Sequence, residues 1–235
     1  MPNSQEESSS PTVQPTVYRY CQEVFAVSNE KQARNIILTP SPGITTEERW
    51  ELETAYLASE ILKFLEPSEK SLILDFGCGL GRLPKAMLKQ SPCRILGVDI
   101  SVSMRQLAPG YVLDENFSVV SRQVFVALVA NGLRVDAAIA LWVLQHCPQV
   151  EREVDLIHQA LLPSGRFYVL NNKRSCIPTI KSSNPTDVAW MADGTDLLAI
   201  LQTQFHTLKI GTLPVSVTTP DVVTGIFTAE LQKKS

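Results

Sequence analysis

The sequence contains few cysteines, and their positions exclude two classes of protein. Its 235 residues include five, at positions 21, 78, 93, 147 and 176, an odd number with no CxxC pair. A disulfide-stapled domain or a cysteine-based zinc site needs paired or clustered cysteines. We therefore expect free, reduced thiols, as in a cytoplasmic protein.

A strong charge of one sign and a long apolar run are also missing. The net charge of −3 at pH 7 provides no general attraction to nucleic acid or to an anionic membrane surface. No apolar run reaches the roughly 18 residues that cross a bilayer. Residues 1–16 include acidic residues and lack the apolar core of a secretory signal, so they predict a disordered tail. We expect neither nucleic acid nor a membrane as a partner.

Behind the tail, helical patterns alternate with short apolar runs typical of strands. The first helix opens with a Thr45-x-x-Glu48 capping box and ends at Pro67. Predicted strands cover 71–76, 93–101, 117–121, 135–143 and 166–172, with later β-like segments at 206–210 and 222–231. Further helical patterns cover 81–90, a segment from 103, 122–133, 149–165 and 196–205.

This alternation predicts the fold class. Strands separated by helices need crossover connections, which favour a mainly parallel, doubly wound sheet. We expect an α/β fold with seven strands and helices on both faces, a three-layer α/β/α sandwich. The sequence shows no internal repeat and no interdomain linker, so residues 17–235 are expected to form one domain. Within it, residues 17–66 form an N-terminal helical segment that can cover the site as a lid.

The most informative stretch is LILDFGCGLGRL, residues 72–83. Three glycines stand at alternate positions directly after a predicted strand. Without Cβ atoms, such a turn can take positive φ angles and lets a ligand approach the backbone closely. The dinucleotide fingerprint GxGxxG would need a glycine at position 82, where Arg82 stands. The pattern is instead D-x-G-x-G-x-G, beginning at Asp75.

This pattern, with Asp99 at the end of the next strand, resembles the class I S-adenosylmethionine-dependent methyltransferase superfamily, which has a Rossmann-like fold. The resemblance runs from about Thr54 to Arg174. It includes three further matches in the right order, GVDIS, LWVLQH and LLPSGRFYVL. The alternative is a glycine turn that binds an unrelated ligand or none.

The resemblance also implies which residues hold S-adenosylmethionine. The glycine turn would meet the methionyl portion, which Asp75 would anchor directly or through water. Asp99 would accept hydrogen bonds from both ribose hydroxyls; its other possible role, capping the next helix, is one that Ser101 can fill. Ile100 and Met104 would line the adenine. The full set is Asp75, Gly77, Cys78, Gly79, Gly81, Asp99, Ile100, Met104, Ser121 and Leu141.

Ser121 enters this set through a departure from the family. Many members carry an aspartate after the third strand, where it meets the adenine amine. Here the sequence reads Val120-Ser121-Arg122-Gln123, and Ser121 is the candidate substitute.

The segment AIALWVLQHCPQV after the fourth strand narrows the choice of acceptor. It lacks the Asn/Asp-Pro-Pro-aromatic tetrapeptide of enzymes that methylate amino groups of DNA bases or protein glutamine. Catechol-type members gather metal-binding carboxylates here, but Leu141 and Trp142 are not ligands, so we expect no metal. Cys147-Pro148-Gln149 has the wrong order for the Pro-Cys-Gln of DNA cytosine methyltransferases.

Two roles are open to His146, at the cofactor end of the fourth strand. An imidazole titrates near neutral pH and can remove a proton from an acceptor, or it can simply hydrogen-bond the backbone. Trp142 either shapes the acceptor pocket or belongs to the core. Asn171 and Asn172, after the fifth strand, either contact the acceptor or lie in a solvated loop.

The resemblance thus implies an enzyme that transfers a methyl group to a small-molecule acceptor. Two other functions stay open. A protein with this pattern can bind the cofactor as a catalytically silent partner, or it can methylate protein or RNA, which the charge balance disfavours. No pattern in the sequence defines an oligomeric state.

Overall fold

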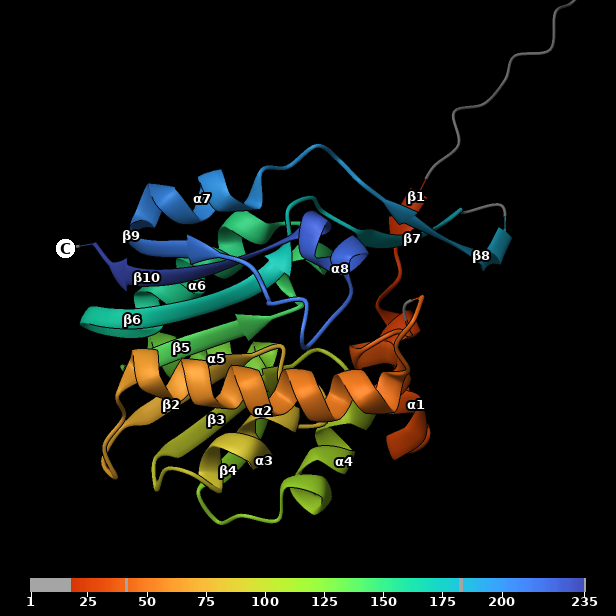
Figure 1. Ribbon diagram of the computed structural model, residues 1–235. Helices are drawn as coiled ribbons and strands as arrows, with labels where there is room; N and C mark the ends of the chain where they lie inside the picture. Colours follow the sequence, from red (N-terminus) through yellow and green to blue (C-terminus); the bar gives the residue numbers. More distant parts are fainter. Residues whose placement is uncertain (1–17, 41, 182–183, 235) are drawn as a thin grey trace, which may run out of the picture.

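The computed structural model describes residues 18–40, 42–181 and 184–234. The predicted tail, residues 1–16, lies outside this part of the chain. The described residues form a central sheet of seven strands and a smaller sheet of three (Figure 1).

The central sheet has the strand order β4-β3-β2-β5-β6-β10-β9. Strands β2 to β6 pair in parallel, and β10 runs antiparallel to both β6 and β9. This confirms the expected α/β class and its mainly parallel sheet. The strands are β2 (Leu72–Phe76), β3 (Arg94–Asp99), β4 (Phe117–Ser121), β5 (Val135–Leu141), β6 (Leu161–Asn172), β9 (Phe205–Gly211) and β10 (Ile226–Lys233).

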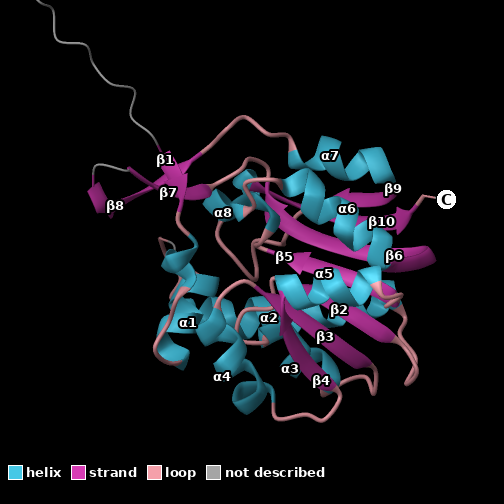
Figure 2. Ribbon diagram, turned by 180° about the vertical axis from the view of Figure 1, so that it is seen from behind, coloured by secondary structure: helices cyan, strands magenta, loops and turns pink. Residues whose placement is uncertain are grey.

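Helices cover both faces of this sheet, as Figures 1 and 2 show from opposite sides. Helices α2 and α3 pack on one face, and α5, α6 and α7 on the other. Neighbouring strand residues point to opposite faces, so Ile73 packs in the α2 cluster and Leu74 in the α5 and α6 cluster. The helices are α1 (Glu30–Ile37), α2 (Thr46–Leu65), α3 (Arg82–Leu88), α4 (Val102–Val112), α5 (Arg122–Ala130), α6 (Val150–Ala160), α7 (Leu197–Gln204) and α8 (Pro220–Gly225), with 3-10 turns η1 (Gln22–Phe25) and η2 (Leu144–His146).

Helix α2 begins and ends as its sequence predicts. The Thr45 hydroxyl accepts from the N–H of Glu48 at 3.2 Å, and the Glu48 carboxylate accepts from the N–H of Thr45 at 2.8 Å. Leu57 and Ile61 are fully buried, and the helix stops before Pro67. Neither α2 nor any other helix in the described ranges is long and apolar enough to cross a membrane.

The three-stranded sheet is not predicted from the sequence. It joins β1 (Tyr18–Tyr20), β7 (Ile177–Lys181) and β8 (Asn184–Met191) in the order β1-β7-β8, with antiparallel pairing. Figures 1 and 2 show it, with α1, beyond the carboxyl ends of the parallel strands. Ligands of doubly wound folds bind at this edge of the sheet, so the small sheet stands where it can cover a ligand.

Two predicted boundaries are wrong. The helix expected over 149–165 ends at Ala160, and β6 begins at Leu161. The Pro-Ser-Gly turn interrupts this strand instead, with a φ of +60° at Ser164 and a register shift against β5. The β-like segment expected over 222–231 begins as helix α8, because Pro220 fits the first helical turn.

Candidate functional site

The glycine turn between β2 and α3 has the conformation that its sequence predicts. Gly77, Gly79 and Gly81 have φ angles of +80°, +52° and +85°. A Cβ on Gly77 would lie 2.4 Å from Cγ2 of Val143, and one on Gly81 would lie 2.4 Å from Cγ2 of Val112. Only glycine fits both the backbone angle and the space at these positions.

Asp99 ends β3 with its carboxylate beside this turn. Its Oδ2 accepts from the N–H of Gly79 and its Oδ1 from the N–H of Ser101, both at 2.8 Å. Burial raises the pKa of Asp99. Each carboxylate oxygen keeps a further lone pair, so Asp99 can still accept hydrogen bonds from a diol in the cavity that it lines. Helix α4 has its own cap, because the Ser101 hydroxyl accepts from the N–H of Met104.

Asp75 lies on β2 and is buried at the wall of the same cavity. In the described part of the chain, no backbone or side-chain group donates a hydrogen bond to its carboxyl group. Burial and the nearby charge of Asp99 raise the pKa of Asp75 to about 7, although Arg82 acts to lower it. A ligand ammonium group beside Asp75 would favour the ionised carboxylate.

These two carboxyl groups open into one cavity of about 1060 Å³ at the carboxyl ends of β2, β3 and β5. Ligand pockets commonly measure roughly 300–1,000 Å³, so the cavity has room for a nucleoside cofactor and a second small molecule. Most predicted site residues line it: Asp75, Gly77, Cys78, Gly79, Asp99, Ile100, Met104, Leu141, Trp142, His146 and Asn172.

Three predicted site residues are not among the described residues that line the cavity. Gly81 is the N-cap of α3. Ser121 caps α5, where its hydroxyl accepts from the N–H of Val124 at 3.2 Å. Asn171 is fully buried, and its Oδ1 accepts from the N–H of Gln145. Asn171 therefore supports the wall that Asn172 presents to the cavity.

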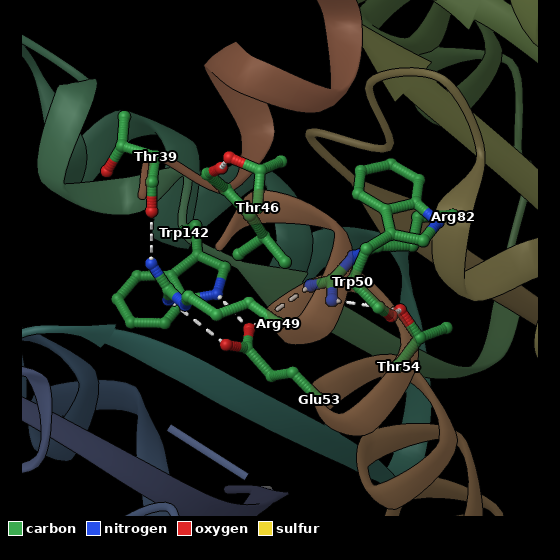
Figure 3. Close-up of polar contacts among 9 residues, drawn as sticks. Thr39, Thr46, Arg49, Trp50, Glu53, Thr54, Arg82 and Trp142 are labelled. Carbon is green, nitrogen blue, oxygen red and sulfur yellow. Dashed lines mark hydrogen bonds and ion pairs between the residues drawn. The ribbon is translucent and has the colours of Figure 1, made fainter. Parts of the chain in front are cut away.

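A buried polar network joins α2 to this cavity (Figure 3). The fully buried Glu53 accepts from Arg49 through Oε2 at 3.0 Å, and from the indole N–H of Trp142 and from Arg82 through Oε1 at 2.9 and 3.5 Å. Two guanidinium groups and one carboxylate leave a net charge of +1. Both arginines line the cavity, so this positive charge is available to an anionic group there.

Trp142, directly after β5, has an unusual backbone. Its φ is +58°, an outlier for a bulky residue. The backbone N–H donates to the carbonyl of Leu170 at 2.8 Å and the indole N–H donates to Glu53, so the residue is held from two sides. Such strain costs on the order of 1–3 kcal/mol and is concentrated at functional sites.

His146 has hydrogen-bond partners at both ring nitrogens. Nδ1 lies 2.6 Å from the carbonyl oxygen of Cys176, which can only accept, so Nδ1 carries the proton. Nε2 then accepts from the side-chain amide of Gln145 at 3.2 Å, while Oε1 of Gln145 accepts from the N–H of Asn172. Burial lowers the pKa of His146, so the ring is neutral at pH 7.

The imidazole also joins three segments of the cavity wall. Its ring centroid lies 5.4 Å from that of Phe25 on η1 and 5.4 Å from that of Trp190 on β8. The N-terminal segment and the β7–β8 hairpin thus meet on the loop that follows β5. Tyr20 and Val24 of the N-terminal segment line the cavity beside these rings.

Sequence reasoning misses several residues that line the cavity or support its wall. Phe25 and Trp190 belong to segments that carry no motif. Glu53 does carry a signal, because it stands four residues before Leu57 on the apolar stripe of α2, where a charged residue is unexpected. Arg122 and Glu153 line the cavity as an ion pair whose two charges come from different helices.

A doubly wound sheet, a glycine turn and a carboxylate at the end of the next strand, gathered around one cavity, are the features of a Rossmann-like fold. In the residues that the structure describes, no group of three or more His, Cys, Asp or Glu side chains is placed to hold a metal ion. All five cysteines are free thiols.

The chain belongs to the methyltransferase domain family, whose model matches residues 49–202. The matched range begins in α2, ends in α7 and includes the glycine turn and Asp99. No curated protein matches the sequence.

Solved structures with this fold include proteins of different chemistry. The PH0226 protein from Pyrococcus horikoshii OT3 aligns with a TM-score of 0.62 and 14% identity, over 88% of this chain and 100% of that one. The 1,6-didemethyltoxoflavin-N1-methyltransferase from Burkholderia thailandensis, solved with 1,6-didemethyltoxoflavin and S-adenosylhomocysteine, aligns with a TM-score of 0.53 and 21% identity, over 77% and 79%. The [4+2]-cyclase SpnF aligns with a TM-score of 0.57 and 16% identity, over 76% and 80%. At these identities the likeness shows the fold.

Proposed function

We propose that the protein transfers a methyl group from S-adenosylmethionine to a small-molecule acceptor. The observation that carries this proposal is the position of Asp99. Its carboxylate is fixed by two backbone N–H groups, keeps lone pairs for a ribose diol and lies beside a glycine turn. The methyltransferase family, and the neighbour solved with S-adenosylhomocysteine, support the choice of cofactor.

The rest of the cavity has groups for the amino-acid end of this cofactor. Asp75 provides an acceptor for the ammonium group close to the glycine turn. The net positive charge of Arg49, Glu53 and Arg82 provides attraction for the carboxylate. The carboxyl group of Asp75 and the guanidinium groups would together orient the charged amino-acid end of the cofactor.

The acceptor is proposed to be small and largely apolar. The part of the cavity wall built by the N-terminal segment, the β7–β8 hairpin and α8 presents mainly apolar groups: Val24, Phe25, Ile36, Ile37, Trp190 and Val222. Such a wall favours a small apolar molecule.

Bound S-adenosylmethionine supplies an electrophilic methyl group on a sulfonium. The chain would then act mostly by positioning, holding the acceptor atom near the methyl carbon in a site from which water is excluded. We propose that His146 is a positioning residue, because both ring nitrogens already have partners. The base role would need Gln145 to release Nε2.

A second function deserves a direct test, because the same fold occurs in a [4+2]-cyclase. The protein would be incubated with methyl-labelled S-adenosylmethionine and a panel of small apolar amines, phenols and carboxylic acids. The proposal predicts acceptor-dependent formation of S-adenosylhomocysteine together with a labelled product. Conversion of an acceptor without S-adenosylhomocysteine would favour a reaction of the cyclase kind. Cofactor binding with no turnover across a broad panel would favour a silent partner protein.

A further inference from the structure

The adenine end of the proposed cofactor lacks its expected partner. Ser121 is the candidate from the sequence, but its hydroxyl caps α5 and it is not among the described residues that line the cavity. The next residue does line the cavity. Because Asp99 pairs with Ser121 between β3 and β4, Ile100 and Arg122 follow their strands at the same level of the sheet edge.

Arg122 forms an ion pair with Glu153, which lines the same cavity. Its Nε donates to both carboxylate oxygens of Glu153, at 2.9 and 2.8 Å. Glu153 lies in the first turn of α6, is 8% exposed and also lines the cavity. Burial is the main cause of the raised pKa of Tyr20, which lies on the cavity wall, and the charges of Asp99 and Glu153 add to it.

The ion pair keeps unused hydrogen-bonding groups. Only Nε of Arg122 is engaged in the described part of the chain, which leaves the terminal NH₂ groups as donors. Each oxygen of Glu153 has a further lone pair. The pair therefore presents an acceptor and donors side by side, each held by the other.

We propose that Glu153 and Arg122 recognise the edge of the adenine base, an inference that rests on the proposed S-adenosylmethionine cofactor. Glu153 accepts a hydrogen bond from the exocyclic amine, and Arg122 donates one to an adjacent ring nitrogen. Adenine offers this order of donor and acceptor, whereas hypoxanthine places a carbonyl oxygen where adenine has its amine. That oxygen would face the Glu153 carboxylate and be repelled by it.

A purely structural role for the pair is the competing explanation. The pair links α5 to α6, and partly exposed ion pairs contribute little to stability. A structural pair would not discriminate between bases, whereas a good two-point contact to a base is worth roughly 1–3 kcal/mol, or about 5- to 150-fold in affinity.

The test is calorimetric binding of S-adenosylhomocysteine and of its 6-oxo analogue S-inosylhomocysteine to the full chain. The parent protein is expected to prefer the adenine ligand by about tenfold or more. Glu153→Gln offers an amide that can accept or donate, so the preference should shrink to roughly threefold or less. Arg122→Met keeps the aliphatic stem and loses the donors, and should weaken binding of S-adenosylhomocysteine about fivefold or more. Glu151→Gln, an exposed change in the same helical turn, should alter neither value.

Equal binding of both ligands by the parent protein would overturn this inference without any variant. It would also be overturned if Glu153→Gln kept the full preference. If the folded parent protein bound neither ligand, the proposed function itself would fail and this inference with it.

Discussion

The indole N–H of Trp142 donates a hydrogen bond of 2.9 Å to Glu53, which joins the end of the central strand β5 to helix α2. Glu53 also neutralises part of the charge on two buried arginines. One carboxylate therefore fixes a strained tryptophan, the α2 helix and the residue that follows the glycine turn. The part of the cavity wall that Arg49, Arg82 and Trp142 form therefore depends on residues that are far apart in the sequence.

We predict that Glu53→Gln destabilises the protein by about 3–5 kcal/mol, because the change removes the carboxylate that Arg49 and Arg82 share. Urea denaturation followed by circular dichroism would measure this. Glu51→Gln, an exposed change on the same helix, should alter the free energy of unfolding by about 0.5 kcal/mol or less. Equal effects of the two changes would mean that the buried network contributes little.

The glycine turn can be tested by a matched pair of alanine substitutions. Gly77 and Gly132 both have positive φ angles, of +80° and +93°. An added Cβ would overlap Val143 at position 77, whereas nothing lies within 4 Å of it at position 132. Gly132→Ala should cost about 1–2 kcal/mol from the backbone alone, and Gly77→Ala about 1–3 kcal/mol more from the overlap. Equal losses in denaturant unfolding would show that Val143 moves aside freely.

Cofactor binding should depend on pH through Asp75. Its pKa is raised to about 7 by burial and by Asp99, against the opposing effect of Arg82. If only the ionised carboxylate binds the ammonium group, affinity for S-adenosylhomocysteine should fall about tenfold per pH unit below 7. The dissociation constants that calorimetry gives at pH 8 and at pH 5 should differ by roughly 10²-fold. Asp75→Asn should bind more weakly at pH 8 and lose this dependence; a variant that kept it would assign the titration to another group.

The same carboxyl group affects the stability of the ligand-free protein in the opposite sense. Because its pKa is higher in the folded state than the ordinary value of 3.8, the folded protein holds more protons between pH 4 and 7. Its contribution to stability is therefore full below pH 4 and is lost as the pH rises through 7. The difference between parent and Asp75→Asn unfolding free energies across this range would measure it.

The methylation rate and its pH profile can distinguish a positioning role of His146 from a role as general base. His146→Asn can still donate to the Cys176 carbonyl, so for a positioning residue we expect the methylation rate at saturating cofactor to fall less than about tenfold. A base would lose about 10²-fold or more. A base would also give the parent enzyme an acid limb that disappears in the variant. A large rate loss together with the loss of that limb would contradict the positioning role.

The fold, and the half of the cavity that we propose binds the cofactor, can be located from the sequence because their signals are local. The glycine turn and Asp99 each lie at the end of a short apolar run, and parallel strands bring those ends together. The half of the cavity that we propose binds the acceptor has no such local signal. Phe25 and Trp190 meet on His146 because β1 pairs with β7 and β7 pairs with β8, and no local sequence pattern predicts this pairing.

Side-chain direction sets a second limit on prediction. Asn171 and Asn172 are equivalent candidates in the sequence, but neighbouring residues of β6 point to opposite sides. Only Asn172 lines the cavity, while Asn171 is buried behind it. Ser121 and Arg122 are also neighbours of which one lines the cavity. The Ser121 hydroxyl caps helix α5, whereas Arg122 lines the cavity.

The most direct measurement of the proposed cofactor is calorimetric titration with S-adenosylhomocysteine and, separately, with NADH. We predict micromolar binding of S-adenosylhomocysteine, about −8 kcal/mol, and no binding of NADH. Asp99→Asn, which removes one carboxylate acceptor at constant size, should weaken S-adenosylhomocysteine binding about tenfold or more. NADH binding as tight as that of S-adenosylhomocysteine, or no S-adenosylhomocysteine binding by the folded protein, would contradict the assignment.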